Sequence, residues 1–137
     1  FDALQPWSSD DWLHDPDAKA ALHFGDFNGD AEADVLEVND AQMRVALSSN
    51  GVLGDAIDAG TVGFHDDPAR GEGWWIFAGD VDQDGLDDLI QINEFGEAWV
   101  ARSLGNGTFG PPVREAQLGF HHKPEGAWQI FVGHARK

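Results

Sequence analysis

The chain has no cysteine and few basic residues. Without cysteine, a disulfide framework and thiol chemistry are both excluded. Eight Lys and Arg stand against 25 Asp and Glu, which gives a formal net charge of −17 over 137 residues. A surface of that sign repels nucleic-acid phosphates and anionic lipid headgroups, so nucleic acid is not an expected partner.

Long apolar runs are missing as well. No segment approaches the roughly 20 apolar residues that a membrane-spanning helix needs, so no membrane insertion is expected. No stretch shows a sustained 3.6-residue apolar period, which predicts little helix. The length suits one domain with a sizeable core.

Two acidic nonapeptides are the most informative segments of the chain. They are Asp-Phe-Asn-Gly-Asp-Ala-Glu-Ala-Asp at 26–34 and Asp-Val-Asp-Gln-Asp-Gly-Leu-Asp-Asp at 80–88, with an offset of 54 residues. Each places oxygen-bearing side chains at positions 1, 3, 5 and 9. Ca²⁺ binds six to eight oxygen ligands, so this spacing favours a calcium loop, and without a cation the carboxylates would repel one another. The pattern predicts a calcium-dependent repeat with two Ca²⁺ sites.

The similarity between the two units extends beyond the acidic loops. The segment 76–80 matches 22–26, and 89–93 matches 35–39, at the same offset of 54 residues. The segment 130–134 begins a third unit, in which His134 stands where a loop would start. Short segments rich in β-branched and aromatic residues, separated by Gly, Asn and Asp, predict strands. These are 20–26, 33–38, 42–48, 56–63, 74–80, 87–93, 97–103, 112–119 and 127–133, with a less distinct one at 2–7. Hairpin turns are expected at 93–96 and 104–107.

Four strands per unit of about 50 residues are typical of a β-propeller blade. The predicted fold class is therefore all-β, with propeller-like blades of four antiparallel strands and about two and a half repeats in an incomplete ring. We expect one repeat domain over 1–137, divided into the end of a preceding blade (1–19), blade one (20–73), blade two (74–126) and the start of a third (127–137). Unpaired strand edges promote further pairing, so we expect an oligomer, or a part of a longer chain or complex.

An EF-hand is the obvious rival for the acidic loops. That loop ends with a bidentate Glu at position 12, which Glu37 supplies in the first unit but Gln91 does not in the second. The missing helical pattern on both sides also disfavours an EF-hand.

The repeat instead resembles the FG-GAP or VCBS type, found in the β-propeller of integrin α subunits and in many secreted bacterial proteins. The resemblance rests on Gly25 to Asp30 with Asp34, and on Gly79 to Gly85 with Asp87, Asp88 and Leu89. It implies that the loop joins the first two strands of a blade and binds Ca²⁺ through side chains at positions 1, 3, 5 and 9 and the carbonyl at position 7. The implied ligands are Asp26, Asn28, Asp30, Glu32 and Asp34 in the first loop, and Asp80, Asp82, Asp84, Leu86 and Asp88 in the second.

Position 6 differs between the loops. It is Gly85 in the second and Ala31 in the first, and a positive φ there would be harder for Ala to adopt. This predicts tighter calcium binding at the second site. The alternative for both loops is that the ions only brace a turn.

Aromatic and histidine residues recur in phase with the repeat. A Trp ring can pack against the C–H face of a sugar while His binds its hydroxyls, so a ligand site between blades is one interpretation; packing between blades is the other. Trp75 and Trp99 lack aromatic counterparts, which favours them as surface contacts. The candidate ligand-binding residues are His65, Trp74, Trp75, Trp99, His121 and Trp128.

The leading functional hypothesis is a calcium-stabilised, non-catalytic binding module for carbohydrate, with a protein ligand next. No nucleophile motif, phosphate-binding loop or catalytic metal pattern is present, so we do not expect an enzyme. The alternatives are an accessory or catalytic part of a secreted polysaccharide hydrolase, and an adhesion or structural repeat. Because such calcium sites suit a compartment rich in Ca²⁺, the expected location is secreted or extracellular.

Overall fold

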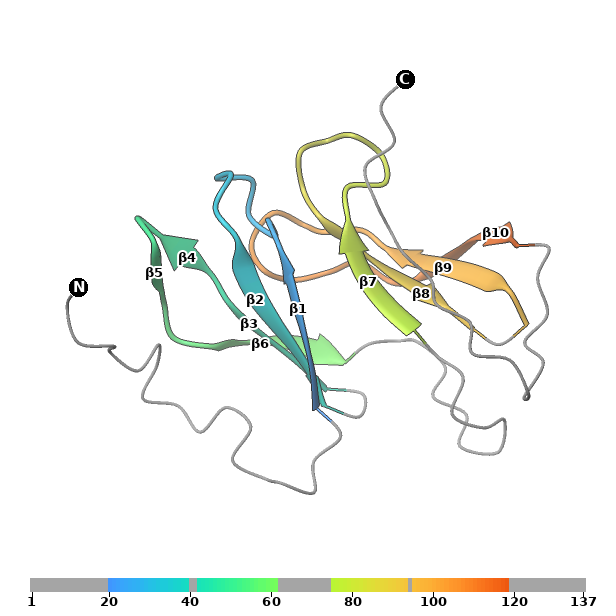
Figure 1. The fold of residues 1–137 in the computed structure, drawn as a ribbon, viewed down its shortest axis with the longest axis horizontal. Helices are drawn as coiled ribbons and strands as arrows, with labels where there is room; N and C mark the ends of the chain where they lie inside the picture. Colours follow the sequence, from blue (N-terminus) through green and yellow to red (C-terminus); the bar gives the residue numbers. More distant parts are fainter. Residues whose placement is uncertain (1–19, 40–41, 62–74, 94, 119–137) are drawn as a thin grey trace.

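The computed structural model describes residues 20–39, 42–61, 75–93 and 95–118, and in these ranges the protein is all-β. Two four-stranded antiparallel sheets form most of it, in the orders β1-β2-β3-β6 and β7-β8-β9-β10 (Figure 1). A small hairpin, β4-β5, extends from the first sheet. The strands are β1 Ala20–Gly25, β2 Asp34–Asn39, β3 Gln42–Ala46, β4 Ser48–Ser49, β5 Val52–Leu53, β6 Ile57–Thr61, β7 Trp75–Gly79, β8 Asp88–Ile92, β9 Glu97–Ala101 and β10 Val113–Gln117.

The first two strands of each sheet pair in matching register. Gly25 pairs with Asp34 at the end of the β1-β2 ladder, and Gly79 pairs with Asp88 at the end of the β7-β8 ladder. Each acidic nonapeptide is therefore the connection between the first and second strands of its sheet. Both connections lie at the same end of the molecule (Figure 1).

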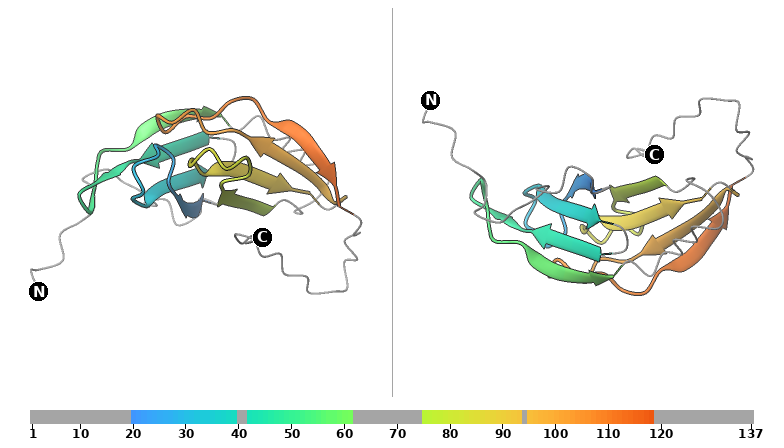
Figure 2. Two further views of the ribbon diagram at one scale, coloured as in Figure 1. Left: turned by 90° about the horizontal axis from the view of Figure 1, so that it is seen from above. Right: turned by 90° about the horizontal axis from the view of Figure 1, so that it is seen from below.

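The hydrophobic core lies between the two sheets, and its buried members come from the first acidic loop and from β2, β3, β6, β8 and β9. The first strands of the two sheets, β1 and β7, lie next to each other (Figure 2). Phe27, at the second position of the first loop, is fully buried, and its ring meets Phe109 edge to face with centroids 5.4 Å apart. Alternate residues of each strand face the same side of a sheet, so one face of each sheet supplies the core. Its buried members are Phe27, Leu36, Val38, Met43, Val45, Ala59, Leu89 and Ala101.

The two expected hairpin turns are confirmed. Gly96 donates its N–H to the Asn93 carbonyl at 2.9 Å, and Leu104 donates to the Thr108 carbonyl at 2.9 Å. Gly96, Gly105 and Gly107 all have positive φ, the conformation that glycine adopts without steric cost.

Each of the eight strands expected between residues 20 and 119 is present, with ends that differ by a few residues. The expected strand over 42–48 is wrong at its end, because β3 stops at Ala46 and β4 begins at Ser48. There the Ser48 N–H donates to the Asp34 carboxylate at 2.8 Å, and a separate hairpin follows. The strands expected at 2–7 and 127–133 lie outside the described residues, as do the outer segments 1–19 and 127–137 of the predicted domain division.

No helix long and apolar enough to cross a membrane occurs within the four described ranges.

Truncation of the buried ring tests the core between the sheets. We expect Phe27→Ala to lower the free energy of unfolding by about 3 to 5 kcal/mol, because it leaves a cavity between the sheets. Phe24→Ala is the matched control, since the Phe24 side chain is 58% exposed and should cost far less. Chemical denaturation of both variants measures the difference, and equal losses would contradict this placement of the core.

Candidate metal centre

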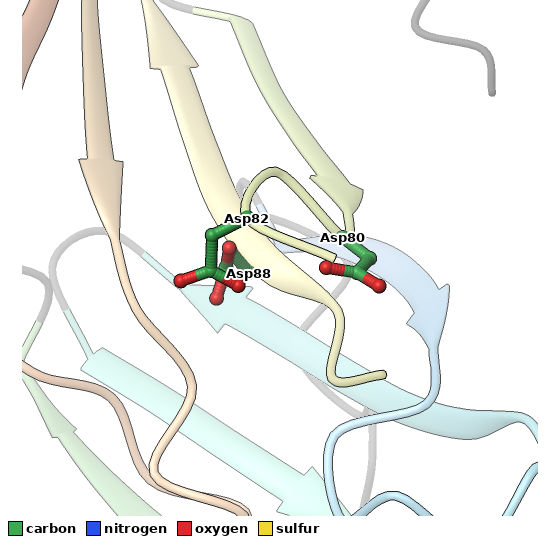
Figure 3. Close-up of side chains that lie close together, drawn as sticks. All are labelled: Asp80, Asp82 and Asp88. Carbon is green, nitrogen blue, oxygen red and sulfur yellow. The ribbon is translucent and has the colours of Figure 1, made fainter. Parts of the chain in front are cut away.

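Three carboxylates converge in the second acidic loop. Asp80, Asp82 and Asp88 each offer an oxygen, and these oxygens lie within 4.8 Å of one another (Figure 3). Asp80 follows the end of β7 and Asp88 begins β8, so the β7-β8 hairpin itself brings them together. Oxygen donors at this spacing suit a hard divalent cation, and the group can hold a metal ion.

In each loop, the carboxylate at position 1 accepts backbone N–H groups from several later residues of the same loop. In the first loop, Asp26 accepts the N–H groups of Gly29 at 2.6 Å, Asp30 at 3.2 Å and Ala31 at 2.8 Å. The second loop repeats this pattern position for position, with Asp80 accepting the N–H groups of Gln83 at 2.7 Å, Asp84 at 3.2 Å and Gly85 at 3.1 Å. These bonds satisfy backbone donors that the tight turn would otherwise leave unpaired.

The position-9 carboxylate ties the loop to the chain just beyond the third strand of its sheet. Asp34 accepts the Phe27 N–H and the Ser48 N–H, both at 2.8 Å. Asp88 accepts the Val81 N–H at 3.3 Å and the Ser103 N–H at 2.9 Å. Both residues are 0% exposed. Burial raises the pKa of each carboxyl above its ordinary range, and the backbone hydrogen bonds oppose that rise.

Positions 3, 5 and 7 differ more between the loops. In the first loop, Asn28 donates its Nδ2 hydrogen to Asp30 Oδ2 at 2.9 Å. The Glu32 carboxylate accepts the N–H groups of Asn50 at 3.0 Å and Gly51 at 2.9 Å, so this side chain braces the β4-β5 turn instead of facing the loop. That leaves the Glu32 carbonyl as its possible ligand, which agrees with the role implied for position 7.

The two loops are not equally arranged for a cation. Within the described part of the chain, three carboxylates converge within 4.8 Å only in the second loop. In both loops the position-5 carboxylate accepts the backbone N–H of position 7, from Glu32 to Asp30 at 2.8 Å and from Leu86 to Asp84 at 2.9 Å. The donor set of the second loop therefore fits Ca²⁺ through Asp80, Asp82 and Asp88, with Asp84 and the Leu86 carbonyl in the same turn.

Positive φ occurs at position 6 of both loops, with 64° at Ala31 and 90° at Gly85. It also occurs at position 4, with 81° at Gly29 and 66° at Gln83. Each loop thus has one glycine and one other residue in the left-handed region. Both loops therefore carry the same steric cost, and the glycine at position 6 gives no reason to expect tighter calcium binding at the second site.

Asp87, which belongs to the repeat pattern but has no implied ligand role, joins the two loops. Its N–H donates to the Asp26 carbonyl at 2.7 Å, and its Oδ2 accepts the Asp26 N–H at 2.8 Å. Beside it, Ser103 donates its hydroxyl to the Phe27 carbonyl at 3.1 Å. In the first loop, Ala33 occupies the position of Asp87.

Of the candidate sugar-binding residues, Trp75 and Trp99 lie within the described part of the chain, on different strands of the second sheet. Trp75 pairs with Ile92, whereas Trp99 pairs with Gln91, so the two rings lie on opposite faces of the second sheet. Trp99 is half-buried and packs against the core. Trp75 is half-buried. His65, Trp74, His121 and Trp128 lie outside the described residues.

A groove of about 260 Å³ opens between the two sheets. Its lining is mostly apolar and carries no charged side chain. The lining residues are Met43, Thr61, Leu89, Ala101, Phe109, Gly110, Pro111 and Pro112.

A solved structure shares this fold. It is a lectin of Agrocybe aegerita, described as specifically recognising non-reducing terminal N-acetylglucosamine, and it aligns with a TM-score of 0.61 and 21% sequence identity over 74% of this chain. This chain covers 26% of the length of that lectin. No protein-family model matches the sequence, and no curated protein matches it.

Removal of the Asp87 side chain tests the connection between the loops. We expect Asp87→Ala to lower the free energy of unfolding by about 1.5 to 3 kcal/mol, because it removes a charged acceptor from a backbone N–H. Asp55→Ala, at an exposed residue, removes the same charge and is the control. Equal stability of the two variants in chemical denaturation would refute this role of Asp87.

The pH dependence of stability tests the buried carboxyls. Since burial raises the pKa of Asp34 and Asp88 in the folded chain, their contribution to stability is present below the unfolded-state pKa of about 4 and is lost as pH rises through the folded-state pKa. In metal-free buffer the melting temperature should therefore be higher at about pH 5 than at about pH 7. General repulsion among the acidic residues acts in the same direction. A melting temperature that falls on acidification would contradict the burial of these groups.

Proposed function

We propose that this chain is a calcium-stabilised, non-catalytic carbohydrate-binding module of the FG-GAP or VCBS type. The observation that carries the proposal is the matching pair of acidic loops at one end of two equivalent sheets. Each loop has the same position-1 and position-9 hydrogen bonds, and the second brings three carboxylates within 4.8 Å. Two Ca²⁺ ions would neutralise four negative charges in these clusters.

A propeller-like arrangement of the sheets is part of the proposal. Ile76 and Ala78 of β7 pack against the core between the sheets. Their counterparts at the offset of 54 residues, Leu22 and Phe24 of β1, are exposed large apolar side chains on the outer face of the first sheet. The side chains that the second sheet buries against the core therefore have exposed counterparts on the outer face of the first sheet. A further sheet packed there, from the same chain, a longer chain or another copy, would continue the blade stacking.

Carbohydrate is the proposed ligand class for two reasons. The lectin that shares this fold is described as recognising a terminal N-acetylglucosamine. Histidine and tryptophan recur in the sequence at corresponding places of successive units, and an indole ring packs well on the C–H face of a sugar. A secreted or extracellular location fits this function, because calcium is abundant there.

Calcium titration of loop variants tests the metal sites. We expect isothermal titration to find two sites in the unmodified chain and one in each of Asp26→Ala and Asp80→Ala, because each variant loses the carboxylate around which its loop folds. Asp55→Ala should retain both sites. Absence of calcium binding in the unmodified chain would refute the proposed metal sites.

A glycan array tests the ligand class. Bound signal on glycans ending in N-acetylglucosamine with calcium, lost with chelator, is the expected result, since the ions hold the loops that join the strands. Turnover of a polysaccharide would instead favour a hydrolase, and silence on every glycan would favour protein adhesion or a structural repeat.

A further inference from the structure

Arg102 extends over the second acidic loop from the end of β9 and contacts three carboxylates. Its Nε lies 3.3 Å from Asp82 Oδ2, and its Nη1 donates to Asp88 Oδ2 at 3.1 Å. Its Nη2 donates to Glu115 Oε1 on β10 at 3.2 Å. Two of these three carboxylates, those of Asp82 and Asp88, belong to the group that can hold a metal ion.

The guanidinium therefore supplies positive charge where a divalent cation would bind. Its planar fork of N–H donors matches carboxylate oxygens, and it stays charged at every working pH. The Asp88 side chain is 1% exposed, so this contact neutralises a buried charge that water does not screen. The Arg102 side chain is 36% exposed, which leaves it a path to swing outward.

The first loop is built differently at the same positions. Leu47 follows β3 where Arg102 follows β9, in matching register with the second strand of each sheet. Asn28 stands at the position of Asp82, and Ala59 at that of Glu115. The arginine and its two extra acidic partners thus occur together in the second unit, and uncharged residues replace all three in the first.

We propose that Arg102 is a resident counter-cation of the second acidic loop. It holds Asp82 and Asp88 together when no Ca²⁺ is bound, and Ca²⁺ must displace it from both. This inference rests on the proposed calcium sites. It makes the second site weaker than the first for calcium and the second loop less dependent on calcium for its folded conformation, the reverse of the order expected from the glycine at position 6.

The test replaces Arg102 by leucine, the residue at the matching position of the first unit. It is made in a variant that lacks the first calcium site, so only binding at the second site is measured. In the Asp26→Ala background, Arg102→Leu should bind Ca²⁺ about tenfold more tightly than the parent by isothermal titration, since the ion no longer displaces a charged hydrogen-bonding partner. Arg114→Leu is the matched control. Arg114 is also an exposed arginine, but it pairs with Glu97 at 3.3 Å on the outer strands.

A second measurement examines Arg102 without calcium. In metal-free buffer, Arg102→Leu should melt at a lower temperature than Arg114→Leu, and added Ca²⁺ should remove most of that difference. Arg102→Lys keeps the charge but not the fork, so it should fall between the two and serves if the leucine variant does not fold.

The outcomes separate this inference from the function on which it rests. Unchanged calcium affinity in Arg102→Leu, or an equal gain in Arg114→Leu, would overturn the role of Arg102. Absence of calcium binding in the unmodified chain would overturn the proposed function, and the metal-free melting comparison would then decide alone whether Arg102 stabilises the loop.

Discussion

The buried aspartate at the start of the second strand of each sheet is the constraint on which the rest of the structure depends. Asp34 and Asp88 each accept one backbone N–H from the loop and one from the second residue beyond the third strand. A buried carboxylate without such donors would carry a large desolvation cost. With them, one side chain fixes the loop, the hairpin and the chain just beyond the third strand relative to one another, and it leaves the loop oxygens grouped for a cation.

The same chemistry extends from one sheet to the next. The position before this aspartate is Asp87 in the second loop, and its reciprocal hydrogen bonds with Asp26 connect the two loops directly. The apolar core lies beneath this contact, with Phe27 closed against Phe109. The loops proposed to bind calcium are thus also the polar rim of the interface between the sheets, so cation binding and sheet packing share residues.

The acidic loops also show how two similar sequences reach different charge balances. Both fold around a position-1 aspartate, and both contain one glycine and one other residue at positive φ. In the second loop, Asp82 is an additional carboxylate and forms an ion pair with Arg102. In the first unit, Asn28 and Leu47 stand at these two positions. A loop that is paired with an arginine and a loop that is not would respond differently to the removal of calcium, although their backbone hydrogen bonds are alike.

The sequence alone determined the all-β class, eight of the ten strands in the described residues, and the loop positions that carry oxygen, because alternation, turn residues and ligand spacing are local properties. It did not determine the break between Ala46 and Ser48, the opposite faces of Trp75 and Trp99, or the contacts of Asp87 and Arg102. Those depend on register and on residues far apart in the chain. Only the tertiary structure decided which loop carboxylates form ion pairs with an arginine of the same chain. Those pairs depend on which strand end lies over which loop.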